Sequence, residues 1–284
     1  GGGFIAAELG HFFGSLGTQI NIIHHSKYLL PNEDEEISKK FTEIFSKKYN
    51  VYLDCTPNLV SKKNGKFVIS FKRSGSNKYL EIESDQLLIA TGRVPNSDIL
   101  NLPKTGIKLN DDGYIKVDGS LSTNIEGIFA LGDIIGRHQF RHSANLEAQY
   151  AFYNIFNRKK KIQVDYSAMP HAIFSSPQVA AVGYNEQELR EIGNMNYEKS
   201  IYRYIDTAMG RALEDTEGFV KFLVNKDNRK ILGCHIIGSQ ASILIHEVLV
   251  AIKSGDGTID NISKTVHVHP ALSEVVSRAA LRYL

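Results

Sequence analysis

Two histidines near the end of the chain have neighbours that suit proton transfer. Pro270 follows His269 directly, and Glu274 lies five positions after that histidine. An unperturbed histidine titrates near neutral pH, and a carboxylate bonded to one ring nitrogen fixes the tautomer and supports the charged ring. Metal binding by His267 and His269 is the alternative, but Pro270 and the carboxylate suit acid–base chemistry better. We therefore predict that His269 and Glu274 form an acid–base pair, with His267 as the competing histidine and no metal site.

The chain opens with a second informative pattern, Gly1-x-Gly3-x-x-Ala6. Glycines at this spacing allow a tight turn and a close approach of the backbone to a pyrophosphate, at which the next helix directs its N-terminus. A strand at 19–24 follows that helix, whose expected apolar face is Leu9, Phe12, Phe13 and Leu16. A glycine-rich tag remnant is the alternative. The helix and strand in correct phase favour the second half of a dinucleotide-binding βαβ unit, with its first strand missing.

Two further segments end in small-residue turns that are typical of ligand contacts. Ala90–Asn96 reads ATGRVPN, and Gly127–Asp133 reads GIFALGD. In open α/β sheets, ligands bind outside the carboxyl ends of the strands. Taken alone, each turn fits an ordinary strand exit equally well.

The remaining pattern predicts the elements that hold these segments. A helix begins at Asn32 as its N-cap, a hairpin turns at Asn64-Gly65, and residues 85–90 read as a buried strand. A later helix runs through Phe156. After Tyr166 the chain reads as a separate α+β module with strands at 179–183, 197–205, 218–225 and 231–237 and helices at 185–192 and 239–253.

Length and composition set wide bounds on the function. A chain of 284 residues suggests about two domains, and 42% apolar residues suffice for packed cores. The net charge of +2 implies no broad nucleic-acid-binding surface, and the apolar stretch 241–252 is too short and too polar to cross a membrane. Cys55 and Cys234 lie far apart in the sequence and fit a reducing compartment. We expect a soluble, cytoplasmic protein.

Four motifs in this order resemble the pyridine nucleotide–disulfide oxidoreductases, the flavoprotein family of glutathione reductase and dihydrolipoamide dehydrogenase. They are Gly1–Ala6, Ala90–Asn96, Gly127–Asp133 and His267–Glu274. Residues 141–148 and 209–216 are most similar to the mycothiol disulfide reductase branch, whereas the His-x-His-Pro pair is similar to dihydrolipoamide dehydrogenase. The resemblance implies an α/β fold with a Rossmann-like NAD(P)H-binding domain at 1–95, the remainder of an FAD-binding domain at 96–163, and an α+β dimerisation domain at 164–284.

The resemblance also implies an FAD-dependent NAD(P)H:disulfide oxidoreductase. Such an enzyme acts as a homodimer on a small-molecule or lipoyl disulfide, without nucleic-acid or membrane partners. His269, oriented by Glu274, would reach across the dimer to the redox-active cysteines of the other subunit. We expect that the N-terminal FAD half with this cysteine pair is missing here, because neither Cys55 nor Cys234 matches it. The fragment alone would then be inactive and retain little flavin.

The family's motifs carry cofactor contacts over to this chain residue by residue. Phe4 matches the aromatic residue that gates the flavin face, and Glu8 matches a carboxylate near the nicotinamide carboxamide, with an exposed helical acid as the alternative. Asp133 would contact the ribityl chain or phosphate region of FAD, and the next helix would direct N–H groups at the flavin. The coenzyme contacts also include Gly1, Gly3 and Ile5. The FAD contacts also include Gly92, Arg93, Gly132, His142, Ser143 and Ala144.

The end of the second strand bears on the choice between NADH and NADPH. NAD-selecting folds place an acidic residue about twenty positions after the first glycine, and residues 21–27 contain none. His24, His25 and Lys27 could meet a 2′-phosphate, with His25 where NADPH enzymes carry an arginine. Pro31, at the second arginine position, resembles the NADH enzymes instead, and a neutral histidine offers no charge. We expect NADPH, with NADH as the alternative.

Two other functions stay open on the sequence. A flavin NAD(P)H oxidase or quinone reductase would share the fold but lack the redox cysteine pair. A non-catalytic module would dimerise and hold a nucleotide without flavin.

Overall fold

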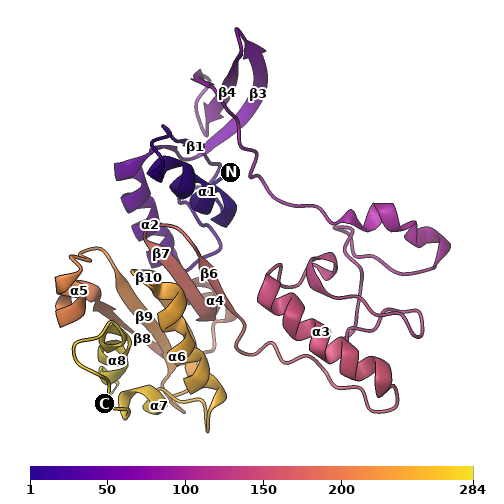
Figure 1. Ribbon diagram of the computed structural model, residues 1–284, viewed down its shortest axis with the longest axis vertical. Coiled ribbons are helices and arrows are strands. Elements are labelled where there is room, and N and C mark those ends of the chain that lie inside the picture. Colours follow the sequence, from indigo (N-terminus) through magenta and orange to yellow (C-terminus); the bar gives the residue numbers. More distant parts are fainter. Residues whose placement is uncertain (284) are drawn as a thin grey trace. The chain divides into compact units, whose positions relative to one another are not determined.

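The computed structural model describes residues 1–283, which fall into two compact units (Figure 1). The first unit joins residues 1–91 to the segment that begins at Pro170, and the second comprises Gly92–Met169. We expected three consecutive domains, at 1–95, 96–163 and 164–284. The first and last of these segments pack together in one unit, because they share an apolar core.

The N-terminal part of the first unit is a small α/β layer. Strands β1 and β2 pair in parallel, with Ile22 opposite Val51, and a parallel pair needs a crossover such as the helix between them. The elements are α1 (Phe4–Ser15), β1 (Asn21–Ile23), α2 (Glu35–Lys48) and β2 (Asn50–Tyr52).

Helix α1 buries its small residues rather than its large ones. Ala6, Ala7 and Gly10 are buried, whereas Phe12, Phe13 and Leu16 are 55%, 44% and 72% exposed. The expected apolar face of this helix is therefore wrong. Small side chains let the helix approach β1 closely: a Cβ at Gly10 would lie 3.9 Å from the Cδ1 of Ile22.

The N-cap of helix α2 lies two residues after the expected N-cap, Asn32. Asp34 is the N-cap, and its Oδ1 accepts a hydrogen bond from the N–H of Glu36 at 3.1 Å. Acidic residues in the first turn and lysines in the last complement the helix dipole. The apolar face of α2 buries Ile37, Phe41, Ile44 and Phe45.

A three-stranded antiparallel sheet follows β2. It contains β3 (Cys55–Lys63), β4 (Lys66–Arg73) and β5 (Tyr79–Ser84), in that order. The predicted turn at Asn64-Gly65 is confirmed, because both residues have positive φ, of 50° and 83°, as a two-residue hairpin requires. The strand expected at 85–90 is wrong. No described segment pairs with these residues, so Leu88 and Ile89 are 50% and 74% exposed.

The C-terminal part of the first unit is a five-stranded antiparallel sheet with the order β6-β7-β10-β9-β8. Helix α6 packs along β6, β7 and β10, and α8 packs against β8 and β9. The strands are β6 (Pro170–Ile173), β7 (Gln178–Gly183), β8 (Tyr197–Arg203), β9 (Phe219–Asn225) and β10 (Ile231–Gly238). The helices are α4 (Glu186–Ile192), α5 (Ala208–Ala212), α6 (Ala241–Lys253), α7 (Asp260–Ser263) and α8 (Ser273–Leu281).

One row of this sheet meets the apolar face of α2. Ile173, Val179, Ile237 and Phe219 lie opposite one another across β6, β7, β10 and β9. All four belong to the same buried cluster as Ile37, Phe41 and Phe45 of α2. This shared core joins segments that are far apart in the sequence.

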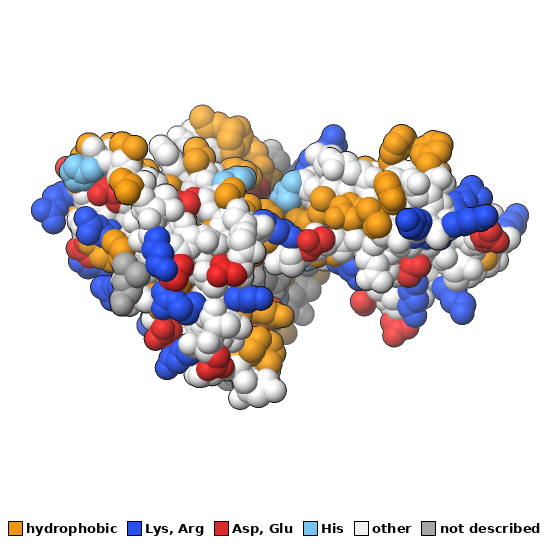
Figure 2. Space-filling model, turned by 90° about the horizontal axis from the view of Figure 1, so that it is seen from below, with side chains coloured by type: hydrophobic (Ala, Val, Ile, Leu, Met, Phe, Trp, Pro, Cys, Tyr) orange, Lys and Arg blue, Asp and Glu red, His pale blue; other side chains and the backbone are white. Residues whose placement is uncertain are grey.

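The second unit contains one long helix and short turns. Helix α3 (Arg141–Phe156) packs on an apolar cluster that includes Leu121 and Ile135. Single-turn 3₁₀ segments lie at Asn96–Leu100, Leu102–Lys104 and Gly132–Ile135. Residues 127–131 form only an isolated bridge, Ser122 to Phe129, instead of the expected strand. Apolar side chains are grouped on the surface of this unit (Figure 2), and Phe152 and Phe156 of α3 are 67% and 72% exposed.

Glu33, which precedes α2, forms an ion pair with His171 of β6. The His171 Nε2 lies 2.8 Å from Oε1 of Glu33. Burial alone would lower the pKa of His171, but the hydrogen bond and charge of Glu33 outweigh it and raise this pKa. The stabilisation is therefore complete below about pH 6.5, the ordinary histidine pKa, and is lost as the pH rises through the raised value.

We expect Glu33→Gln to lower the free energy of unfolding by about 1–2 kcal/mol at pH 5.5 and by progressively less at higher pH. Urea denaturation of both proteins at several pH values measures the difference. Histidines outside the pair contribute equally to both proteins and cancel. A difference that stays constant or grows with pH contradicts this account of His171.

Candidate functional site

The predicted acid–base pair forms at the start of α8. The Nδ1 of His269 lies 3.0 and 3.1 Å from the two carboxylate oxygens of Glu274, which is in the first turn of that helix. The Glu274 carboxylate also accepts a hydrogen bond from the N–H of Ala271 at 3.2 Å. The hydrogen bond from His269 lowers the pKa of Glu274 despite partial burial. The His269 side chain is 69% exposed, so Nε2 remains for proton exchange.

His267 occupies a different environment. Its Nε2 pairs with the carboxylate of Glu247 on α6, and its Nδ1 lies 2.9 Å from the carbonyl oxygen of Thr265. The side chain is only 9% exposed. Both ring nitrogens of His267 are thus engaged within the chain, whereas only one nitrogen of His269 is. Among residues 1–283, no three His, Cys, Asp or Glu side chains gather closely enough to hold a metal ion.

Two of the three glycines at the chain start are required by close packing. A Cβ at Gly1 would lie 1.9 Å from the carbonyl oxygen of Ala90, and one at Gly2 would lie 2.6 Å from the ring of His24. Gly3 is the N-cap of α1 and has open space where a Cβ would be. The start of α1 has no side-chain cap. Because the first N–H groups of a helix lack intrahelical partners, this open end can receive an anion.

The three basic residues after β1 differ in their exposure. His24 is buried against Gly2 and Leu29, and burial, followed by the nearby charge of His25, lowers the pKa of His24 to about 4. It is neutral at pH 7, so the expected cationic contact does not fit His24. His25 and Lys27 are exposed. Lys27, together with Tyr28 and Pro31, lines a hollow of about 220 Å³.

The other expected coenzyme contacts lie on α1. Phe4 packs against the apolar core of the first unit and Ile5 is half-buried beside it. The Oε1 of Glu8 accepts a hydrogen bond from the N–H of Phe174, just after β6, at 3.0 Å. Glu8 is therefore not a simple exposed helical acid, because it already fixes α1 to the C-terminal sheet.

The expected FAD contacts of the second unit gather around one turn. Arg93 Nη1 lies 3.4 Å from Oδ2 of Asp133, and Gly92 precedes this arginine with a φ of 133°. Gly132 has a φ of 76°, and a Cβ there would lie 3.5 Å from that of Ala144 on α3. The turn and the helix start thus lie side by side. His142, in the first turn of α3, stacks on Phe140 with ring centroids 5.3 Å apart.

Sequence reasoning missed Glu147, a fully buried carboxylate on α3. It accepts hydrogen bonds from the N–H of Gly132 at 2.5 Å, the hydroxyl of Ser143 at 3.2 Å and the hydroxyl of Tyr166 at 2.9 Å. Burial and then the bond to Glu147 raise the pKa of Tyr166 to about 12. The usable signal was the Ser143-to-Glu147 spacing of four, which places both residues on one helix face.

Comparisons with known proteins agree with this geometry. The sequence profile described as pyridine nucleotide-disulphide oxidoreductase matches residues 1–149, and the profile of that family's dimerisation domain matches residues 169–280. Dihydrolipoyl dehydrogenase of Corynebacterium glutamicum is 33% identical over 283 residues, which is 99% of this chain and 60% of that protein. Mycothione reductase of Mycobacterium tuberculosis is 34% identical over 291 residues, again 99% of this chain and 61% of that protein.

Solved structures show the same fold. The HOCl-induced flavoprotein disulfide reductase RclA of Escherichia coli, in a Cu(II) complex, superposes with a TM-score of 0.88 at 23% identity, over 99% of this chain and 62% of that one. LpdA of Mycobacterium tuberculosis superposes with a TM-score of 0.88 at 23% identity, over 99% of this chain and 60% of that one. The chain spans about three fifths of the length of these relatives.

The predicted family and α/β fold with a C-terminal dimerisation domain are confirmed. Among the described residues, no helix combines the length and apolar character needed to cross a membrane. The chain belongs to the pyridine nucleotide-disulphide oxidoreductase family.

Proposed function

We propose that the protein is an FAD-dependent NAD(P)H:disulfide oxidoreductase that works as a homodimer. The observation that carries the proposal is the His269–Glu274 pair, which presents one exposed ring nitrogen beside a carboxylate that holds the other. Membership of the family, together with relatives named dihydrolipoyl dehydrogenase and mycothione reductase, supports a disulfide or dithiol as the substrate. The bound flavin would pass electrons between NAD(P)H and that disulfide.

His269 would move the proton that thiol–disulfide exchange requires. The thiolate is the attacking species, so a base must remove a thiol proton and an acid must return one to the leaving sulfur. The ring would do both through Nε2 while Glu274 holds Nδ1 and stabilises the charged form. Cys55 and Cys234 are buried, and burial raises the pKa of both thiols, so the proposal assigns the reactive thiols to neither.

A second copy of the chain would cover the surface around His269. Val266 and Val268, which alternate with the two histidines, are 96% and 75% exposed. On α6, Ile243 and Val250 are each 64% exposed. Apolar residues exposed in this way fit a dimer interface, as does the match to the family's dimerisation domain. His269 would then act on a thiol brought by the other subunit.

The residues of the second unit fit a flavin nucleotide. Gly132 leaves the turn open beside the start of α3, a helix of 16 residues without a side-chain cap. Asp133, whose side chain is 59% exposed, could accept hydrogen bonds from ribityl hydroxyls, and the N–H groups at the start of α3 would face negative charge on the reduced ring. Arg93 orients Asp133.

The first unit would hold the coenzyme, with NADPH favoured over NADH. Gly1–Gly3 and the start of α1 would receive the pyrophosphate, and Phe4, Ile5 and Glu8 would lie nearer the nicotinamide. His25 and Lys27 would meet the 2′-phosphate, and Lys27 lines the hollow. Two acids also line this hollow, but Glu33 is paired with His171 and Glu35 lies 3.9 Å from Arg190. We further propose a cytoplasmic location, because two free cysteines suit a reducing compartment.

The acid–base role predicts the phenotype of His269→Gln in the intact protein. Reduction of the flavin by NAD(P)H should proceed nearly as in the wild type, while disulfide turnover falls by roughly 10²–10⁴. Stopped-flow absorbance separates the two half-reactions. Glu274→Ala should slow turnover less, and His267→Gln, which removes a histidine without an available nitrogen, serves as the matched comparison. Wild-type turnover by His269→Gln would remove His269 from the mechanism.

The coenzyme assignment predicts a selective effect of the exposed basic residues. His25→Ala and Lys27→Ala should each raise the KM for NADPH about tenfold, since a charge-assisted phosphate contact contributes about 1.5–3 kcal/mol, and change the KM for NADH little. Lys39→Ala, an exposed lysine of α2 outside the hollow, is the control. Steady-state rates with both coenzymes decide the matter. A wild-type preference for NADH, or equal effects on both coenzymes, contradicts the assignment.

The geometry of Glu147 predicts a loss of flavin without loss of the fold. Glu147→Leu removes both accepting oxygens, so the N–H of Gly132 loses its hydrogen-bond partner and the turn at Asp133 shifts. The purified variant should carry several-fold less FAD per chain by absorbance, with an unchanged far-UV circular dichroism spectrum. Ser122→Ala, which changes a hydroxyl outside this turn, is the control. Full flavin content in the Glu147 variant shows that the carboxylate does not hold the turn.

A further inference from the structure

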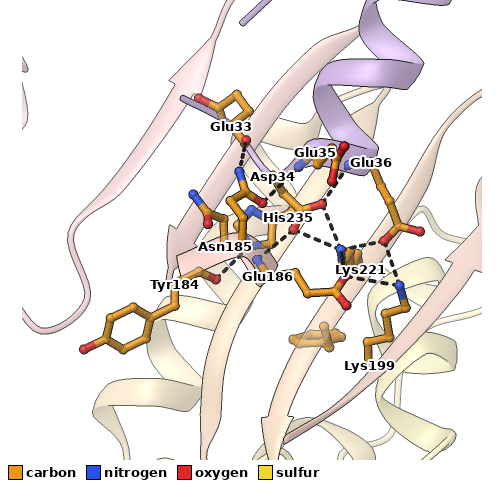
Figure 3. Close-up of polar contacts among 12 residues, drawn as sticks. Glu33, Asp34, Glu35, Glu36, Tyr184, Asn185, Glu186, Lys199, Lys221 and His235 are labelled. Atoms are coloured by element: carbon orange, nitrogen blue, oxygen red, sulfur yellow. Dashed lines mark hydrogen bonds and ion pairs between the residues drawn. The ribbon is translucent and has the colours of Figure 1, made fainter. Parts of the chain in front are cut away.

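A lysine lies inside the first unit where the sequence shows an otherwise apolar strand. Lys221 of β9 is fully buried, and its Nζ lies 2.8 Å from Asp34, 2.6 Å from Glu186 and 2.5 Å from Glu36 (Figure 3). Asp34 and Glu36 belong to the start of α2, whereas Glu186 begins α4. Neither the proposed proton transfer nor the flavin site uses this cluster.

The cluster is balanced in charge. Three carboxylates face three cations, because Lys199 and Arg190 also bond Glu186, at 3.1 and 2.8 Å. Burial would raise the pKa of Glu186, but the hydrogen bonds from these cations and from Lys221 lower it to about 2. Burial would likewise lower the pKa of Lys221, and its three carboxylate partners instead raise it. Removal of Lys221 would leave mutually repelling charges at the start of α2.

The sheet presents this charge in register with the rest of the contact. Two residues along each strand from the apolar row, on the same face of the sheet, lies a second row, in which His171, Ala181, His235 and Lys221 are direct neighbours. Its two ends meet consecutive residues of the chain, since His171 binds Glu33 and Lys221 binds Asp34. Apolar packing is not directional, so these charged contacts fix where α2 begins on the sheet.

The start of α4 also forms hydrogen bonds with residues 33–35. The second carboxylate oxygen of Asp34 accepts from the N–H of Glu186 at 3.0 Å. The Gln187 side chain donates to the carbonyl of Glu33 at 2.8 Å and accepts from the N–H of Glu35 at 3.2 Å. Residues 33–35 are thus held on both sides by the dimerisation domain.

Further hydrogen bonds connect the start of α2 to the glycine turn, Gly1–Gly3. The Ser38 hydroxyl of α2 donates to the carbonyl of Leu30 at 2.6 Å, and the N–H of Leu30 donates to the carbonyl of Gly2 at 2.8 Å. The loop at 24–34, between β1 and α2, is therefore bonded both to the start of α2 and to the glycine turn. The hollow at this loop is lined by Lys27 and Tyr28 from one segment and by Gln187 from the other.

We propose that Lys221 is a positioning residue for coenzyme binding. By holding Asp34 against β9, it fixes the loop that presents His25 and Lys27, so that the dimerisation domain sets the affinity for the 2′-phosphate end of the coenzyme. The inference rests on the proposed function, in which this hollow receives that end. It adds that a residue without contact to the coenzyme tunes coenzyme affinity.

Lys221→Met in the intact protein tests the proposal. Equilibrium dialysis should show a dissociation constant for NADPH raised about tenfold and one for NADH raised less. Single-turnover reduction of the disulfide by prereduced enzyme should keep its rate, which a general loss of structure would not allow. Lys221→Arg should restore most of the affinity. Lys199→Met, which removes a half-exposed cation from the rim of the same cluster, is the matched control and should change binding little.

Lys221→Met leaves three carboxylates without their shared buried cation, and such a loss is strongly destabilising. Asp34→Asn keeps the size of the side chain and two of the three carboxylates, and therefore provides a second test with the same expected selectivity. Unchanged NADPH affinity in a folded variant overturns the proposal, as does a parallel fall of coenzyme binding and the disulfide step. If the wild type binds neither coenzyme, the proposed function fails and the inference fails with it. If the wild type binds NADPH and the folded variants bind it equally well, only the inference fails.

Discussion

The contact between α2 and the five-stranded sheet is the constraint on which the first unit depends. Asp34 and Lys221 are 187 positions apart, yet both are fully buried. An apolar row supplies attraction without direction, and the adjacent charged row supplies direction. Because two buried charges are costly to separate once they are desolvated, the start of α2 has one stable position. The Gly1–Gly3 turn and the hollow inherit that position through Leu30.

The same logic distinguishes the two histidines of the C-terminal segment. Each has a carboxylate, but Glu247 and a carbonyl occupy both nitrogens of His267, whereas Glu274 occupies one nitrogen of His269. A fully engaged ring anchors its segment to α6 and a half-engaged ring can exchange a proton. In the segment 266–269, His267 thus anchors the chain to α6 and His269 keeps one ring nitrogen for proton exchange, while Val266 and Val268 are exposed.

Sequence predicted those features whose causes are local. The Asn64-Gly65 hairpin follows from positive φ at both positions, and the C-terminal strands follow from short, largely apolar segments. The predicted cap of α2 is Asn32, whereas the distant Lys221 and Glu186 hold Asp34 at that position, which the local sequence does not reveal. The 85–90 segment has the composition of a strand but no described partner. A lysine in the apolar run of β9 was a readable sign of a buried charge, although its partners were not.

The central claim is that electrons from NADPH reach a disulfide, and anaerobic stoichiometry tests it most directly. The intact protein would be mixed with limiting NADPH and excess disulfide, namely lipoamide or oxidised mycothiol, and new thiols would be titrated. Each NADPH carries two electrons and cleaves one disulfide, so the account predicts two thiols per NADPH consumed. Consumption of NADPH only when oxygen or a quinone is supplied, with no thiols formed, would contradict it.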